Sequence, residues 1–388
     1  MSLQSALRTF GGGPRISASE RIGSRIHILD LECVHGGKRH RAQGKGLTHA
    51  AALASAQGEL LERLCARAPE RPLECAPIEA AGPGAIDPRS TLLFSERQYR
   101  DRRPPREALA IGDVLVPDPI TAQTKFAWTG ASHYQIGQIR RVAAAATYFG
   151  FLAEGAAHCI ADSNGMAVAE TRSDAVRHGL LELVERDAVA IWWYNRLLRP
   201  PVPAAWTDSA DCRALLEDLS DFGPELLDLT HDLAIPVVAA TGFTPHGFLA
   251  MGFGAHPDPA SAARSALLEF AQCVVNRGKS PPGQSPVRAS AWSRRDDQPF
   301  LHAQPEAARA DRGPVSDPAE HLARLGLDVI VVDFESPLEI SCVKVVVPGL
   351  RPWFRRLAPG RLYDVPVSLG WLSRRLPEEA LNPAAFDL

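Results

Sequence analysis

The stretch His178-Gly179-Leu180-Leu181-Glu182-Leu183-Val184-Glu185-Arg186-Asp187 combines an apolar helical pattern with a pair of acids. Residues three apart on a helix share a face, so this spacing aims two carboxylates into one volume. The pattern also occurs earlier, where Ser55 precedes Glu59-Leu60-Leu61-Glu62-Arg63. Paired carboxylates on apolar helices cost free energy, which a counter-charge must offset. Mg²⁺ bound to a polyphosphate supplies such a charge, because Mg²⁺ prefers a few carboxylates plus phosphate oxygens over an all-protein cage.

A third apolar segment, residues 260–275, repeats the spacing in weaker form with Glu269 and Gln272. Each segment alone is also compatible with a solvated helix face that carries local Glu–Arg pairs. Three such segments embedded in Ala, Leu and Val, with few other charges, favour a shared metal–nucleotide site.

The composition excludes several classes of protein. The 388 residues are 45% hydrophobic and 22% charged, which is typical of a soluble globular protein. No run approaches the roughly 18 apolar residues that cross a membrane, and the N-terminus lacks the apolar core of a secretory signal, which favours a cytoplasmic protein. A net charge of −3 does not favour binding to nucleic acid. The seven cysteines contain no CxxC pair, so neither a zinc site nor a disulfide framework is indicated, and Cys65 and Cys273 are expected in the core.

The order of helical and strand patterns predicts an α+β or mixed α/β fold with mixed sheets, in a single domain over residues 1–388, because no strict βαβ alternation is present. Thr48 is a good N-cap for a helix that ends near residue 66, and a second helix runs over 173–196 into a Trp-Trp-Tyr cluster expected in the core. Expected strands cover 26–34, 142–150, 237–241, 248–254, 329–333 and 340–347. Residues 1–24 are expected to be loose, 69–107 irregular and 279–318 a mobile loop.

Seven motifs together identify a family resemblance. They are Gly44-Lys45-Gly46-Leu47-Thr48, Ala54-Ser55-Ala56-x-x-Glu59-x-x-Glu62-Arg63, Ser163-Asn164-Gly165-Met166-Ala167, the stretch 178–187, Gly252-Phe253-Gly254-Ala255-His256-x-Asp258, Glu269-x-x-Gln272 and Val345-Val346-Val347-Pro348-Gly349-Leu350. In this order they resemble the YcaO superfamily, from about residue 44 to the C-terminus. Trp192-Trp193-Tyr194-Asn195-Arg196, Phe94-Ser95-x-x-Gln98 and Leu381-Asn382-Pro383 resemble its azoline-forming cyclodehydratase branch.

The resemblance implies a single YcaO-type domain in which acidic helices form a site for ATP and magnesium. Phosphoryl transfer needs positioning and charge neutralisation more than covalent chemistry, and paired carboxylates supply both without a Walker loop. The implied magnesium ligands are Glu59, Glu62, Asp174, Glu182 and Glu185. The implied nucleotide-binding residues are Ser55, Glu59, Asn164, Glu170, Glu182, Arg186, Arg264, Glu269 and Gln272. No catalytic residue is assigned.

The chain departs from the family pattern at several positions. Glu170-Thr171 stands where Asn-Thr is usual, and Ser265 where an arginine is usual. Arg264, about 100° around the helix from Ser265, would have to reach across to compensate. The family's N-terminal nucleotide-contacting lysine has no assigned position, and Gly44-Lys45-Gly46 is by itself a weak phosphate-loop signal. The tail ends without the Pro-rich run of many azoline-forming members.

The implied function is that of a cyclodehydratase subunit, which uses ATP to convert Cys, Ser or Thr of a ribosomal precursor peptide to an azoline by amide O-phosphorylation. The implied partners are the precursor peptide, a separate protein that binds its leader and a flavin dehydrogenase, and a homodimer is one candidate assembly. No nucleic acid or membrane partner is expected. Two alternatives stay open: a thioamide-forming enzyme, and a scaffold whose altered pocket no longer turns over ATP.

Overall fold

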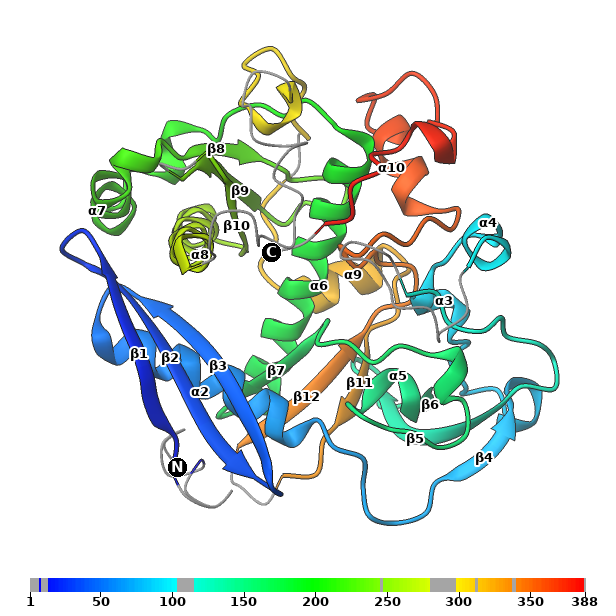
Figure 1. Cartoon of the computed structure of the whole chain (residues 1–388). Helices are drawn as coiled ribbons and strands as arrows, with labels where there is room; N and C mark the ends of the chain where they lie inside the picture. Colours follow the sequence, from blue (N-terminus) through cyan, green and yellow to red (C-terminus); the bar gives the residue numbers. More distant parts are fainter. Residues whose placement is uncertain are drawn as a thin grey trace.

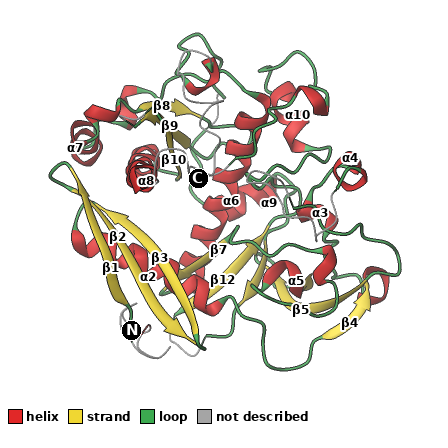
Figure 2. Cartoon of the chain, viewed as in Figure 1, coloured by secondary structure: helices red, strands yellow, loops and turns green. Residues whose placement is uncertain are grey.

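The computed structural model describes residues 7, 13–102, 115–244, 247–279, 298–310, 313–336 and 340–386. Helix α6 (Arg172–Asn195) lies at the centre of the molecule, and the named strands of the described residues form three sheets around it (Figures 1 and 2). The helix contacts β7 and β12 of one sheet and β9 and β10 of another. This arrangement turns the different faces of α6 toward different layers.

The N-terminal sheet has the strand order β1-β2-β3, and helix α2 (His49–Cys65) packs on it. The strands are β1 (Arg15–Ile22), β2 (Ile26–His35) and β3 (Lys38–Gly46). Thr48 caps α2 as expected, since its side chain accepts a hydrogen bond from the Ala51 N–H at 3.1 Å. Strand and helix approach very closely, because a Cβ at Gly44 would lie 2.1 Å from the Ala52 carbonyl oxygen. The expectation of a loose segment over 1–24 is wrong for β1, which pairs with β2 along its length.

The second sheet has the order β10-β9-β8, and helix α8 (Pro259–Lys279) packs on β10. Its strands are β8 (Glu225–Asp228), β9 (Val237–Phe243) and β10 (Leu249–Ala255). Glycines again allow the close approach, since a Cβ at Gly252 would lie 2.0 Å from the Phe270 nitrogen. The two helix–strand pairs, α2 on β3 and α8 on β10, are therefore built alike.

The third sheet has the order β4-β5-β11-β12-β7, and β6 pairs with β5. Its strands are β4 (Glu74–Pro77), β5 (Lys125–His133), β6 (Ile139–Ala143), β7 (Met166–Ala169), β11 (Ile330–Asp333) and β12 (Ser341–Val346). The expected strand over 142–150 is wrong, because β6 ends at Ala143 and a short helix follows at once. Residues 69–107 hold β4 and two short helices rather than irregular chain, although 103–107 lie outside the described residues.

The remaining elements are short helices that connect these layers. The α-helices are α3 (Arg89–Leu92), α4 (Glu96–Arg100), α5 (Ala144–Thr147), α7 (Ala210–Asp218), α9 (Pro318–Arg324) and α10 (Arg361–Ser368). The 3₁₀ turns are η1 (Ile78–Ala81), η2 (Ala156–His158), η3 (Ala204–Trp206), η4 (Ser220–Phe222), η7 (Pro299–Leu301) and η8 (Glu378–Ala380).

The core around α6 confirms the expected aromatic cluster. Trp192, Trp193 and Tyr194 are buried, and Phe300 of η7 packs against both tryptophans. The expectation of a mobile loop over 279–318 is therefore wrong for the buried turn at 299–301, whereas 280–297 lie outside the described residues. Cys65 and Cys273 are buried as expected.

The α+β fold class is confirmed. The sheets were expected to be mixed, but every pairing between named strands is antiparallel. Helices α2, α6 and α8 match the three predicted acidic segments, with ends within four residues of those expected. None of the helices in the described ranges has the length and apolarity that a membrane crossing needs.

Candidate functional site

The acids of α2 and α6 are close enough to influence each other's ionisation. Burial raises the pKa of Glu62 well above its usual range, and the carboxylates of Glu182 and Glu59 raise it further. Only the Val168 N–H and Arg186 oppose this effect among the main causes. Glu62 is therefore a half-buried carboxyl group whose ionised form needs more positive charge nearby.

A tight turn before β7 presents one backbone donor to α6. Gly165 has a positive φ of +73°, and its N–H donates to Oε2 of Glu182 at 2.7 Å. A side chain does not fit there, since a Cβ would lie 2.2 Å from the Val345 carbonyl oxygen. Glu182 also pairs with Arg186, four residues on. Burial still raises the pKa of Glu182, although Arg186 and the Gly165 N–H lower it.

The second acid of α6, Glu185, lies near the acid of α8. Burial and then the carboxylate of Glu269 raise the pKa of Glu185 to about 8. Glu269 is held in place because its Oε2 accepts a hydrogen bond from the Phe253 N–H at 2.6 Å. Lys45 of β3 reaches the same place, with Nζ 3.7 Å from Oε1 of Glu269. The fold thus brings acids from α2, α6 and α8 into one neighbourhood.

Strand β3 links the outer two helices of this neighbourhood through Gln43. Its backbone N–H donates to Oε2 of Glu59 at 3.3 Å, and its carbonyl accepts from Nε2 of Gln272 at 3.5 Å. Its side-chain amide also bonds Asn276 at 3.0 Å. Gln43 therefore sets the spacing between α2 and α8 at the rim of the site.

Arg186 is fixed from three sides. It pairs with Glu182, donates to Oδ1 of Asn164, and its guanidinium lies 4.3 Å from the centre of the Trp353 ring. The C-terminal tail supports this arrangement, because Phe386 stacks on Trp353 with ring centroids 5.2 Å apart. The tail therefore contacts the site indirectly, through Trp353. Residues 387–388 lie outside the described residues.

Four of the predicted site residues make no contact with this group of acids among the described residues. Asp174 lies in the first turn of α6, which Thr171 caps: the Thr171 hydroxyl accepts from the Asp174 N–H at 3.1 Å and donates to Oδ2 of Asp174 at 2.7 Å. The Asp174 side chain is 51% exposed. Glu170 and Ser55 are exposed. Arg264 does not reach across α8, because it pairs with Asp211 of α7 at 3.6 Å.

The residues that do converge fit a magnesium–polyphosphate group. Five carboxylates (Glu59, Glu62, Glu182, Glu185 and Glu269) meet three cations (Lys45, Arg63 and Arg186). No three His, Cys, Asp or Glu side chains in the described ranges are spaced to enclose a metal by themselves. Raised pKa values among oxygen ligands, without a closed protein cage, suit a cation that takes its remaining ligands from phosphates.

Comparison with known proteins identifies the family. The family model of the YcaO cyclodehydratases, described as binding ATP and Mg²⁺, matches residues 43–351. The chain belongs to the YcaO family. ATP and magnesium are therefore its cofactors, in agreement with the half-buried acids.

Individual YcaO relatives extend this result. A heterocyclase solved in complex with substrate and cofactor superposes with a TM-score of 0.86 and 28% identity, over 99% of this chain and 57% of that one. The heterocyclase TruD gives 0.73 and 30%, over 86% of this chain and 50% of that one. This YcaO chain thus spans about half the length of each heterocyclase. An uncharacterised protein of Methanothermobacter thermautotrophicus is 29% identical over 86% of this chain and 88% of its own length.

Sequence reasoning missed several residues of the YcaO site. Lys45 was visible in Gly44-Lys45-Gly46 but was given little weight, since its acidic neighbours come from α6 and α8. Asp162 precedes the Asn164 turn by two residues, and its partners Lys344 and Arg356 come from β12 and the chain that follows it. No spacing in the sequence indicates the contact of Trp353 with Arg186, because the two residues meet only through tertiary packing.

Proposed function

We propose that this chain is the ATP-dependent cyclodehydratase subunit of a peptide-modifying system, and that it forms thiazoline or oxazoline rings from Cys, Ser or Thr of a ribosomal precursor peptide. Membership of the cyclodehydratase family supports the reaction type. The observation that carries the proposal is the half-buried group of acids from α2, α6 and α8, which lies beside the buried Arg186.

In the proposed reaction, the side-chain thiol or hydroxyl attacks the carbonyl carbon of the preceding residue. The carbonyl oxygen then receives the γ-phosphoryl group of ATP, and ADP leaves. That oxygen departs as phosphate while the amide nitrogen loses its proton, which leaves a C=N bond. Of the two protons removed, one remains on the phosphate at neutral pH and one goes to solvent.

The chain's own residues would position and neutralise charge in this reaction. Glu59, Glu62, Glu182 and Glu185 would hold magnesium, which neutralises phosphate charge when bound. Asn164 and Arg186 would bind phosphate oxygens, because both are held at a fixed place by their mutual hydrogen bond. Glu269 and Gln272 would line the rest of the nucleotide pocket, and Lys45 would add a further cation.

The peptide partner belongs to the same proposal. The heterocyclase that superposes with a TM-score of 0.86 was solved in complex with substrate. We propose that the substrate of this chain is a precursor peptide, that a separate protein binds the leader of that peptide, and that a flavin dehydrogenase acts on the azolines.

Mass spectrometry tests the proposal. A Cys- and Ser-containing precursor peptide, incubated with this chain, its leader-binding partner and magnesium–ATP, should lose one water for each ring. Glu185→Gln should abolish that loss, and Glu320→Gln on the exposed face of α9 should not. Exchange of oxygen for sulfur would indicate a thioamide instead. An unmodified peptide without phosphate release would support a scaffold.

A further inference from the structure

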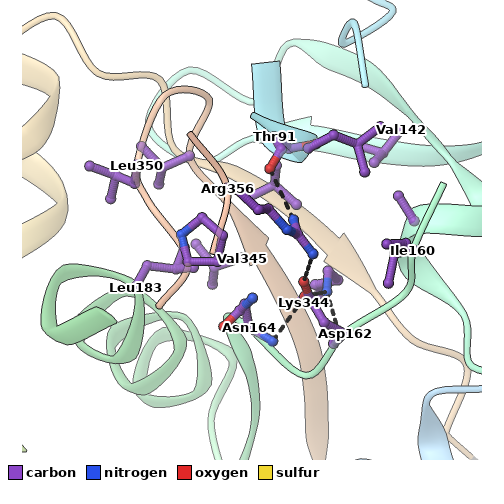
Figure 3. A pocket seen from close by; sticks show the side chains of 15 residues that line it. Thr91, Val142, Ile160, Asp162, Asn164, Leu183, Lys344, Val345, Leu350 and Arg356 are labelled. Carbon is purple, nitrogen blue, oxygen red and sulfur yellow. Dashed lines mark hydrogen bonds and ion pairs between the residues drawn. The ribbon is translucent and has the colours of Figure 1, made fainter. Parts of the chain in front are cut away.

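A second cavity lies beside the acid site, between β12, α6 and the segments that cover them (Figure 3). It contains about 570 Å³ of space, part of it open to solvent. Its walls are apolar and include Leu92, Ala146, Ile160, Leu183 and Leu350. Because part of this space is open solvent, the enclosed part is much smaller, and it suits one side chain rather than a folded peptide.

The floor of this cavity is an ionic cluster in which both carboxylate oxygens of Asp162 already have partners. Lys344 Nζ lies 2.7 Å from the Asp162 carbonyl oxygen and 3.3 Å from its Oδ1, and Arg356 donates to Oδ2 at 3.1 Å (Figure 3). The Asn164 N–H also donates to Oδ1 at 3.2 Å. Two cations therefore share one carboxylate whose oxygens are both occupied. The side chains of Lys344 and Arg356 are only 6% and 5% exposed, so water screens little of the excess positive charge.

Asn164 joins the cavity to the acid site. It lines the cavity, and its Oδ1 accepts the hydrogen bond from Arg186, the partner of Glu182. Lys344 and Asp162 are near enough to Glu182 to shift its pKa in opposite directions. The cavity therefore begins where the proposed phosphate-binding residues end.

We propose that this cavity binds the side chain of the residue whose carbonyl is activated, the one that precedes the ring-forming residue, and that it favours apolar over cationic side chains. The inference rests on the proposed function. A carbonyl and its own side chain leave the same Cα, so they lie only a few ångströms apart. If the carbonyl oxygen is to receive phosphate beside Asn164 and Arg186, the side chain falls into the adjoining cavity. The walls suit an apolar group, and the excess positive charge of the floor repels Lys or Arg.

Three short probes test this selectivity: acetyl-Leu-Cys-amide, acetyl-Gly-Cys-amide and acetyl-Lys-Cys-amide. Their binding to the full chain is measured by saturation-transfer NMR with magnesium and AMPPCP, a non-hydrolysable ATP analogue. The Leu probe should bind about tenfold more tightly than the Lys probe. Ala146→Phe fills the cavity, so it should weaken the Leu probe about tenfold and leave the Gly probe unchanged.

Ala156→Phe is the matched control, because both alanines are half-buried and pack against the same apolar cluster, but only Ala146 lines the cavity. Ile160→Phe fills the cavity from another segment and serves if Ala146→Phe lowers the melting temperature. The assignment would be overturned if the three probes bound equally well or if none of them bound. It would also be overturned if Ala146→Phe weakened the binding of the Leu and Gly probes equally. Weaker binding of magnesium–AMPPCP itself in the filled variants would assign the cavity to the nucleotide. Failure of the unaltered chain to bind magnesium–AMPPCP would instead reject the proposed function.

Discussion

Helices α2 and α6 carry the same Glu-x-x-Glu-Arg sequence in different surroundings. In both, the first glutamate pairs with the arginine four residues on, Glu59 with Arg63 and Glu182 with Arg186. The Arg63 side chain is 50% exposed, whereas that of Arg186 is 9% exposed. Arg63 adds one hydrogen bond to the Arg41 carbonyl at 2.8 Å, and Arg186 adds Asn164 and the Trp353 ring.

The difference shows that the sequence spacing determines which residues form the ion pair, and that tertiary packing determines how much the pair contributes to stability. An exposed pair of this kind contributes about 0–1 kcal/mol, because water screens it and both side chains lose entropy. A buried pair is costly to break, since the remaining charge is left without compensation. The third acidic helix, α8, has no arginine after Gln272. The cation beside its Glu269 is Lys45 of β3.

The largest effect is expected at the acids of α6. Glu182→Gln and Glu185→Gln should each abolish phosphate release, because the proposed site then lacks a magnesium ligand. Their stabilities should differ: Glu185→Gln removes a repelled carboxylate and raises the melting temperature of the ligand-free chain, whereas Glu182→Gln leaves Arg186 unpaired and lowers it. A phosphate-release assay and thermal melts check both. Retained turnover in both variants would mean that these acids are only a helix surface.

The two arginines provide a direct comparison. Arg186→Met should lower the free energy of unfolding by about 3–5 kcal/mol, since it leaves the half-buried Glu182 without its partner. Arg63→Met should cost about 1 kcal/mol or less. Urea titrations followed by circular dichroism measure both values. Equal costs would show that the packing of Arg186 does not distinguish the two helices.

The ligand-free chain should lose stability as the pH rises. The folded-state pKa of Glu185, about 8, lies above its usual 4.5, so folding favours the protonated form. Its contribution is fully present below pH 4.5 and is lost as the pH rises through 8. Glu62 and Glu182 act in the same direction. Melting temperatures between pH 5 and 9 should fall, and Glu185→Gln should flatten the curve. An unaltered slope in that variant would argue against this cause.

The smallest effect concerns the departures from the family pattern near α8 and α6. Ser265→Arg with Glu170→Asn should tighten magnesium–ATP by about 1.5–3 kcal/mol, or one to two decades, because a charge-assisted phosphate contact is gained and an acid is removed. Calorimetric titration of both proteins decides this. Equal or weaker binding in the double variant would mean that another cation, with Lys45 the candidate, already occupies that role.

Local sequence signals were sufficient for the acidic helices, because a capping threonine, an apolar face and paired acids all act within a few residues. Thr48 and α2 illustrate this agreement. Strand β1 was missed because it has few apolar residues and most of its side chains are exposed; it is ordered by pairing with β2. The expected strand over 142–150 includes Val142, Thr147 and Tyr148, which favour strands, but the three alanines at 144–146 favour a helix, and the chain turns into α5 after Ala143.

For the site, too, the sequence predicted local contacts better than contacts between distant segments. Contacts within one helix, such as the pair of Glu182 with Arg186, were evident from spacing. Contacts between distant segments were not, as Lys45 beside Glu269 shows. Arg264 was a reasonable substitute by helical geometry alone, but Asp211 on the neighbouring α7 holds it elsewhere.

The central claim is that the acids of α2, α6 and α8 form one site that requires magnesium and nucleotide together. Differential scanning calorimetry of the unaltered chain, with magnesium, with ATP and with both, tests it most directly. The account predicts that magnesium and ATP together raise the melting temperature more than either alone. At 100 times the dissociation constant, the bound ligand should add about 2.7 kcal/mol to the free energy of unfolding. Glu185→Gln should remove most of that gain. A melting temperature unchanged by saturating magnesium–ATP would contradict it.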